Sequence, residues 1–188
     1  PSMIPARIPD ESANSLRKIV SGPEHCFLEG IYFLPGKIFR GITLEAGRSH
    51  GLVVSGGSGV VIAGCVFRNL GAWAVQISGG SNHGVAGCDI YETGEGGIAL
   101  TGGDRASLRP SGHYAVNNHI HHYARWRRIC KSGISIDGVG IRAANNLIHD
   151  APHMAINFGG NDHLIELNEI HNVVTDAFDA GAIYGGRD

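Results

Sequence analysis

The sequence has no long hydrophobic run and no strong net charge. None of its apolar stretches approaches the roughly 18 residues that a membrane-spanning helix needs, and no basic and apolar signal segment opens the chain. Fifteen Lys and Arg residues face seventeen Asp and Glu residues, a net charge of −2, so no overall field attracts nucleic acid or an acidic membrane. We therefore expect a soluble protein that binds neither, with a neutral partner such as a sugar.

Cysteine motifs and helical periodicity are also missing. Cys26, Cys65, Cys88 and Cys130 show no CxxC or CxxH spacing, which argues against a structural zinc site or a disulfide framework, and we expect reduced, buried thiols. No repeat unit holds a stretch with the apolar period of about 3.6 residues that a helix needs. At 188 residues and 43% hydrophobic composition, the chain is long enough for one domain.

What the sequence does have is glycine, 29 residues of it, and an internal repeat. Five segments align without gaps, at residues 63–69, 86–92, 117–122, 144–150 and 167–172, and they start about 22 to 30 residues apart. Each is followed by a second short apolar stretch that ends in Gly or Asn. A repeat of this length without helices predicts an all-β fold, a parallel β-helix of about five to seven turns.

Stacked turns place equivalent residues above one another at about 4.8 Å, so the repeat predicts ladders of side chains. One apolar ladder should point inward: Phe67, Ile90, Ile120, Ile148 and Ile170. A second inward ladder lies two residues earlier: Cys65, Cys88, Asn118, Asn146 and Asn168. Buried Asn amides there must bond neighbouring backbone, and Asn also accepts the left-handed conformation of a turn.

The residue after each apolar rung should face outward: Arg68, Tyr91, His121, His149 and His171. We interpret this row as a surface stack of rings. A metal site is the alternative, because imidazole is a common ligand. No carboxylate recurs at a spacing that would complete a tetrahedral site, so no metal ligand is predicted.

Residues 1–20 lack the repeat and are predicted to form an N-terminal extension or cap, with the β-helix domain over 21–188. The stretch SANSLRKIV is a candidate capping helix, because an uncovered end of the coil exposes strand edges. For the same reason, open ends favour pairing between copies of the chain.

Two insertions interrupt the repeat, at residues 104–116 and 121–133. The second sets Tyr123 and Trp126 beside Arg125 and two further arginines. Aromatic rings next to guanidinium groups suit stacking on a sugar face, and they equally suit a loop folded flat on the coil. Such a cluster also suits single-stranded nucleic acid, but one patch on a slightly acidic chain argues against it.

The glycine turns after the second stretches carry a row of polar residues: Asn82, Asp104, Asp137, Asp162 and Asp188. Asp162 and Asp188 match best, and adjacent turns would bring their carboxyl groups close enough for acid–base chemistry. Turn residues that only cap backbone amides and a Ca²⁺ site are the two alternatives. Asp176, Asp179 and His153 are expected to reach the same face, where a histidine beside carboxylates can move protons.

Several longer stretches carry a family resemblance. They are "LTGGDRASLRPSGHYAVNNHIHHYARW", "GVGIRAANNLIHDAPHMAINFGGNDHLIELNEIH" and "DAGAIYGGRD". From about residue 40 onward, the chain resembles the right-handed parallel β-helix glycoside hydrolases related to family 141. The resemblance implies a bacterial, secreted or periplasmic enzyme acting on plant or algal polysaccharides, in a family associated with α-L-fucosidase and xylanase activity. Family domains continue further, so a partial domain is expected.

The resemblance also implies site residues. Aspartates are the catalytic type, and the matching positions are Asp162, Asp179 and Asp188, with His153 beside them. Where related sequences carry a second acid before the DAGA motif, this chain has Phe178, and Asp176 is the near substitute. Residues expected to contact the substrate are Tyr123, Arg125, Trp126, Asp137, Asn161, His163, Tyr184 and Arg187.

The predicted function is hydrolysis of a glycosidic bond by a carboxylate pair, with no cofactor required and Ca²⁺ as an option. One alternative is a polysaccharide lyase or epimerase, in which Arg187 would neutralise a uronate beside Asp162 and Asp188. The other is a carbohydrate-binding β-helix without catalysis.

Overall fold

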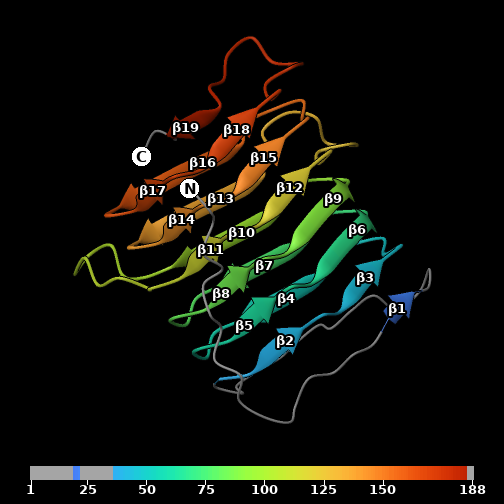
Figure 1. Ribbon diagram of the computed structural model, residues 1–188. Helices are drawn as coiled ribbons and strands as arrows, with labels where there is room; N and C mark the ends of the chain where they lie inside the picture. The colour runs from blue at the N-terminus through green and yellow to red at the C-terminus, as the bar shows by residue number, and fades with distance from the viewer. Residues whose placement is uncertain (1–18, 22–35, 186–188) are drawn as a thin grey trace, which may run out of the picture.

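The computed structural model describes residues 19–21 and 36–185, and within them every regular element is a β-strand. The strands form three parallel sheets that wind around one axis (Figure 1). Sheet A contains β1 (Ile19–Ser21), β3 (Thr43–Glu45), β6 (Val66–Leu70), β9 (Asp89–Thr93), β12 (His119–His121), β15 (Leu147–His149) and β18 (Glu169–His171).

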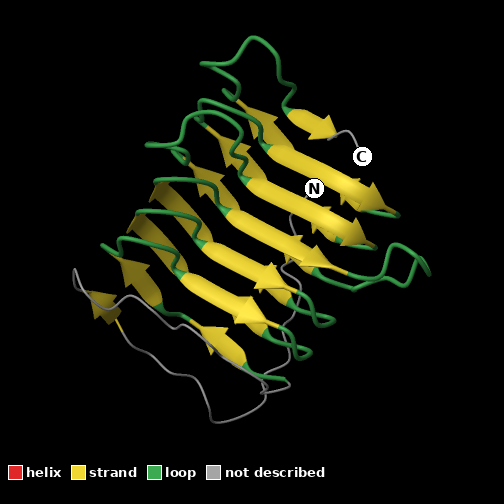
Figure 2. Ribbon diagram, turned by 180° about the vertical axis from the view of Figure 1, so that it is seen from behind, coloured by secondary structure: helices red, strands yellow, loops and turns green. Residues whose placement is uncertain are grey.

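Sheet B faces the viewer when the molecule is seen from behind (Figure 2). It contains β4 (Leu52–Ser55), β7 (Val75–Ser78), β10 (Ile98–Gly102), β13 (Ile134–Val139), β16 (Ile156–Asn161) and β19 (Ile183–Gly185). Sheet C contains β2 (Ile38–Arg40), β5 (Val61–Ala63), β8 (Gly84–Ala86), β11 (Tyr114–Val116), β14 (Arg142–Ala144) and β17 (Leu164–Glu166). Over residues 36–185 the chain visits sheets C, A and B in turn, six times, which confirms the predicted parallel β-helix and its number of turns.

The predicted apolar ladder forms the centre of the core. Phe67, Ile90, Ile120 and Ile148 are each 0% exposed and pair in register along sheet A. Ile170 continues the ladder in the last turn, where it is partly buried. Burial at about 25 cal/mol per Å² of apolar surface makes these stacked side chains a main source of stability.

The predicted ladder of buried amides also forms. The side-chain oxygen of Asn146 accepts hydrogen bonds from the backbone N–H and the side-chain amide of Asn118, both at 3.0 Å. Its own amide donates to the Ala115 carbonyl at 3.0 Å and to the side-chain oxygen of Asn168 at 2.9 Å. Each amide is therefore satisfied by the turns above and below it, as a buried polar group requires.

The left-handed conformation at this corner belongs to a different residue from the one predicted. The positive φ values occur one residue before the ladder, at Gly41, Gly64, Gly87, Asn117, Asn145 and Leu167. The asparagines of the ladder itself point inward, so their side chains bond across turns while the preceding residue bends the chain.

Other expectations need correction. Cys65 and Cys88 are buried free thiols, but Cys130 is exposed, because it lies in the 121–133 insertion rather than in a strand. Ile19 and Val20, the last residues of the predicted capping helix, lie in strand β1, which pairs with β3. The rest of that segment and Cys26 fall outside the described residues.

Histidines cap the corner between sheets B and C. The ring nitrogen Nδ1 of His83 accepts a hydrogen bond from the Val60 N–H at 3.0 Å, and that of His113 accepts one from the His83 N–H at 3.2 Å. His113 is 1% exposed. Burial, and the neighbouring His83 charge after it, lower the pKa of His113 to about 4.

The amide ladder predicts a large effect of Asn146→Ala. The substitution leaves the buried N–H groups of Asn118 without their acceptor, and each unsatisfied group costs about 1–3 kcal/mol. We expect the free energy of unfolding to fall by about 3 kcal/mol in urea titrations. Asn161→Ala, at an exposed position, should change it by less than about 0.5 kcal/mol. Equal effects of the two substitutions would contradict this account of the ladder.

The buried His113 predicts a loss of stability in acid. An unfolded histidine titrates near pH 6.5, whereas the folded His113 has a pKa of about 4. Between these values only the unfolded chain binds the proton, so stability is full above pH ~6.5 and falls toward pH ~4, by about 3 kcal/mol for this group. Urea midpoints measured across this range should fall less steeply for His113→Gln, and parallel slopes would show that another group is responsible.

Candidate functional site

Residues with a left-handed backbone conformation line the corner where the chain leaves sheet A for sheet B. The residue after the outward row of each turn has a φ between 50° and 59°: Ala46, Asn69, Glu92, His122, Asp150 and Asn172. The register of sheet A places these residues in successive turns. The corner thus presents a vertical series of side chains, most of them polar, beside the loops that lead to sheet B.

Two adjoining depressions follow this corner. One has a volume of about 270 Å³ and is lined by residues of the earlier turns, from Ala46 to Gly94, together with Arg125 and Trp126. The other has a volume of about 510 Å³ and is lined by Glu92, His122, Tyr123, Arg125, Arg128, Asp150, Ala151, Pro152, Asn172 and Thr175. Because Glu92 and Arg125 line both, the two depressions form one groove along the axis of the coil, which we call the corner groove.

Ion pairs cross the corner groove. Arg125 lies 2.5 Å from the Glu92 carboxylate, and Arg128 lies 2.5 Å from the carboxylate of Asp176. These side chains are 37–53% exposed, so the pairs contribute little stability. They instead place guanidinium donors and carboxylate acceptors side by side on the walls of the groove.

Asp150 is held as a carboxylate at the same groove. Its Oδ2 lies 2.8 Å from the His149 Nδ1, and its Oδ1 accepts a hydrogen bond from the Asn172 amide at 3.2 Å. These hydrogen bonds lower the pKa of Asp150 below its usual value. Glu92 and Asp150 stand two turns apart on the corner, and strands spaced about 4.8 Å apart separate their backbones by about 9.6 Å.

The structure brings part of the predicted substrate site to the groove. Arg125 and Trp126 line it, and Trp126 is 73% exposed. Asp176 reaches it through Arg128. Tyr123 is a core residue rather than an open stacking platform: it is 1% exposed and its hydroxyl donates to the Met154 carbonyl at 2.8 Å. Because the backbone turns after His122, the Tyr123 ring lies under the corner and forms part of the floor of the groove.

His153 lies beneath the same corner without lining the groove. It is 7% exposed, and its Nδ1 has no hydrogen-bond partner among the described residues. Burial lowers its pKa. Its carbonyl accepts a hydrogen bond from the Val174 N–H at 3.1 Å, which ties the 172–182 loop to the turn below.

The predicted row of stacked acids does not form among Asp104, Asp137 and Asp162. Asp137 lies within β13, opposite Thr101 and Gly159. Asp162 follows the end of β16 with a φ of 56°, and the neighbouring turn has Gly140, with a φ of 64°, at this corner. Asp162 therefore occupies a left-handed turn position, whereas Asp137 sits on the outer face of sheet B.

The neighbours of Asp162 have structural contacts. Asn161 is exposed at the end of β16, and its carbonyl accepts a hydrogen bond from the Gly140 N–H at 3.0 Å. Both ring nitrogens of His163 meet the backbone: Nδ1 accepts from the Ile141 N–H at 3.2 Å, and Nε2 lies 2.8 Å from the Gly159 carbonyl oxygen. His163 thus caps the turn as His83 does in an earlier turn, and its ring is not free to bind a substrate.

Asp162 and Asp179 are not neighbours. Asp162 follows the carboxyl end of β16, whereas Asp179 precedes the amino end of β19, which runs parallel beside β16. The two acids lie at opposite ends of sheet B, so the structure does not join them in one groove. Tyr184 lies on β19 opposite Asn157 and is 41% exposed. Asp188 and Arg187 lie outside the described residues.

The outward row of sheet A forms the predicted ring stack. The rings of Tyr91, His121, His149 and His171 follow one another at centroid distances of 5.0, 5.2 and 4.8 Å, with interplanar angles of 8° or less. Beside the stack, the structure adds a group that the sequence analysis missed, in which Asp89, His119 and His121 bring one ligand atom each within 4.8 Å of the others. An Asp one turn before a His-x-His pair was the available signal.

Comparison with known proteins supports the fold. The family model described as "Right handed beta helix region" matches residues 29–111. Together with the three parallel sheets, this match makes the chain a right-handed parallel β-helix. Domains of this kind are found in enzymes that act on polysaccharides. No curated protein and no solved structure matches the chain, and the resemblance to glycoside hydrolase family 141 stays a prediction. No described segment forms a helix of the length and apolarity that a membrane span requires.

Proposed function

We propose that the protein binds a poly- or oligosaccharide in the corner groove and hydrolyses a glycosidic bond there. The observation that carries the proposal is the placement of two carboxyl groups, Glu92 and Asp150, on one groove at corners two turns apart. Their backbone separation of about 9.6 Å is close to the roughly 6.5–9.5 Å between the carboxyl groups of inverting glycosidases. The site replaces the Asp162 and Asp179 pair, which the fold keeps apart.

The environments of the two carboxyl groups differ in a way that suits acid–base chemistry. Asp150 is kept ionised by His149 and Asn172, as a base that activates water must be. Glu92 is the proton donor in this scheme. Donation requires Arg125 to leave the Glu92 carboxylate and Glu92 to take up a proton from water. The hydroxyl groups of a bound sugar offer Arg125 replacement acceptors.

The shape of the corner groove indicates an extended substrate. It follows the axis past several turns of the coil, from Ala46 at one end, past Arg125 and Trp126, to Thr175 at the other. An exposed indole ring stacks on sugar faces, and the arginines donate hydrogen bonds to hydroxyl oxygens. A neutral chain of sugars fits because Arg125 and Arg128 are already paired with carboxylates.

Replacing either carboxyl group should remove hydrolysis. On plant and algal polysaccharides assayed for new reducing ends, we expect Glu92→Gln and Asp150→Asn each to lower the rate about 10²–10⁴-fold, the usual contribution of a general acid or base. Asp162→Asn is the matched control, because Asn accepts its left-handed backbone, and it should retain full activity. Loss of activity in Asp162→Asn with activity kept in the other two would place catalysis at the B–C corner instead.

The exposed indole should contribute to binding. We expect Trp126→Ala to weaken the affinity for an oligosaccharide substrate about 5- to 10-fold, as loss of a stacking contact worth about 0.5–1.5 kcal/mol implies. Ile129→Ala removes another exposed side chain from the same loop, 62% exposed and away from the groove lining, and should leave the affinity unchanged. Calorimetric titration compares the two. Equal losses would show that the loop, rather than the ring, matters.

The same assays distinguish the two remaining functions. A lyase would release an unsaturated product with an ultraviolet chromophore, in which case Arg125 and Arg128 would neutralise a uronate. A binding domain without catalysis would retain affinity for the polysaccharide and form no product with any substrate, while Trp126→Ala still weakened binding.

A further inference from the structure

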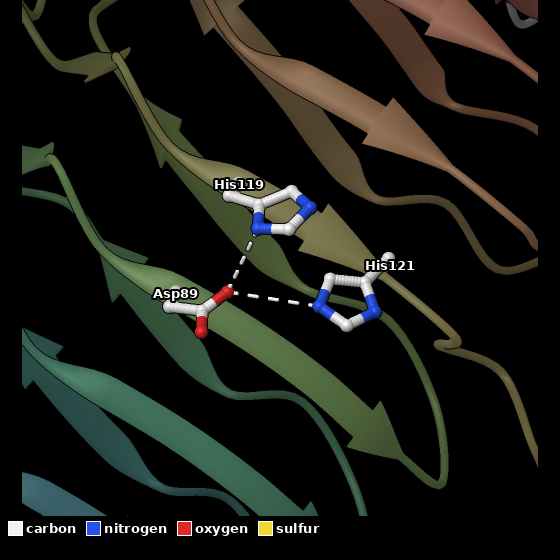
Figure 3. A group of neighbouring side chains, drawn as sticks. All are labelled: Asp89, His119 and His121. Carbon is white, nitrogen blue, oxygen red and sulfur yellow. Dashed lines mark ion pairs between the residues drawn. The ribbon is translucent and has the colours of Figure 1, made fainter.

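Three side chains converge on the outer face of sheet A, beside the ring stack. Asp89 projects from β9, and His119 and His121 project from β12, two residues apart and therefore on the same face of the strand (Figure 3). The register pairs His119 with Asp89. All three side chains are partly buried, so the strands hold them in place while the face remains open to solvent.

The distances between these ligand atoms match a small coordination site. The Asp89 Oδ1 lies 3.1 Å from the His119 Nδ1 and 3.6 Å from the His121 Nε2 (Figure 3). Ligand atoms about 2.0–2.1 Å from a tetrahedral metal ion lie about 3.3 Å apart. These two distances fall on either side of that value, and the two histidine nitrogens lie within 4.8 Å of each other.

Hydrogen bonds behind the site fix the direction of the free ring nitrogens. The His149 Nδ1 lies 2.8 Å from the Asp150 carboxylate, to which it donates, so the neutral His149 ring has its lone pair on Nε2. That Nε2 lies 2.8 Å from the His119 Nε2, which must then carry the proton. The chain of hydrogen bonds therefore assigns the lone pair of His119 to Nδ1, the atom that faces Asp89.

The same reasoning applies to His121. Its Nδ1 lies 2.7 Å from the Nδ1 of His122. When His121 donates in this contact, its lone pair is on Nε2 and also faces Asp89. Both histidines are then neutral, as metal ligands are, and each has a partner for its second nitrogen, as is usual for metal-bound imidazoles.

The Asp89 Oδ1, the His119 Nδ1 and the His121 Nε2 are then three acceptors that face one another, with no hydrogen-bond donor between them. The Asp89 Oδ1 is buried and has no hydrogen-bond partner among the described residues, although the His119 Nδ1 is 3.1 Å away. Lone pairs that close repel one another unless a positive charge lies between them. A cation at this point satisfies all three atoms at once.

We propose that Asp89, His119 and His121 bind a divalent transition-metal ion, Zn²⁺ in the first instance. Two imidazole nitrogens and one carboxylate oxygen suit zinc, whereas Ca²⁺ and Mg²⁺ prefer sites made only of oxygen. Three protein ligands leave a fourth position open to the solvent side of the sheet. The proposal goes beyond the proposed hydrolysis and does not depend on it.

Zinc binding tests the proposal directly. With tag-free protein treated with a chelator, calorimetric titration with ZnCl₂ should show one site, and the melting temperature should rise with zinc. Asp89→Asn and the double variant His119→Ala/His121→Ala should each weaken binding at least 100-fold. Because the three side chains face outward, the variants should keep the unfolding midpoint of the metal-free protein.

Two further variants separate coordination from general attraction to histidine. His149→Ala removes the partner that orients His119 and should weaken binding about 10- to 100-fold. His171→Ala removes the next ring of the same stack, 4.8 Å from His149, and should leave zinc affinity unchanged. The proposal fails if the parent binds no zinc, or if zinc affinity survives in the double variant or falls equally in His171→Ala.

Discussion

The constraint on which this molecule depends is the fixed register between parallel strands of successive turns. Within the strands the backbone bonds the turns above and below, so a residue of an inner turn has one vertical neighbour about 4.8 Å away on each side. A side chain must therefore pack against the equivalent side chains of the neighbouring turns. Aliphatic residues meet this condition inside the coil, flat rings meet it outside, and amides meet it where the chain bends.

The corners offer positions for polar side chains that the inner faces of the sheets do not. Within a strand, alternation sends every second side chain into a core that admits only apolar or fully bonded groups. A residue in the left-handed conformation interrupts this alternation at the end of each pass along sheet A, and its side chain is bound by neither rule. Glu92, His122 and Asp150 occupy such corners. The groove is therefore a product of the bends, whereas the ring stack and the Asp89 cluster are products of the flat outer face.

The ladders of the fold could be read from the sequence because they depend only on recurrence. Phe67 and Ile148 recur at one phase of the repeat, and Asn118 and Asn146 at another, so alignment of the chain on itself was sufficient. The predicted acid row failed because residues 104–113 and the glycine turns differ in length between turns. A shift of three residues moves Asp137 from the corner, where Asp162 lies, onto the face of sheet B.

Contacts between non-equivalent positions of adjacent turns are harder to predict from the sequence. No carboxylate recurs beside the histidine row, whereas Asp89 meets His119 and His121 of the next turn, which lie two residues apart on one strand. The buried position of Tyr123 differs from its predicted role for a related reason. Its loop is rich in arginine and looks exposed, yet the first residues after His122 are still governed by the corner, which turns the ring inward. Composition describes a loop as a whole and cannot tell where its buried part ends.

The left-handed corner after sheet A has a consequence for how such a protein changes over generations. Ala, Asn, Glu, His and Asp all occupy it in this one chain with nearly the same backbone angle. A single amino-acid substitution can therefore replace an acid with an amide or an imidazole at this corner without changing the backbone conformation. The strands keep the fold while the corner residues vary, and each duplicated turn adds one more such variable position.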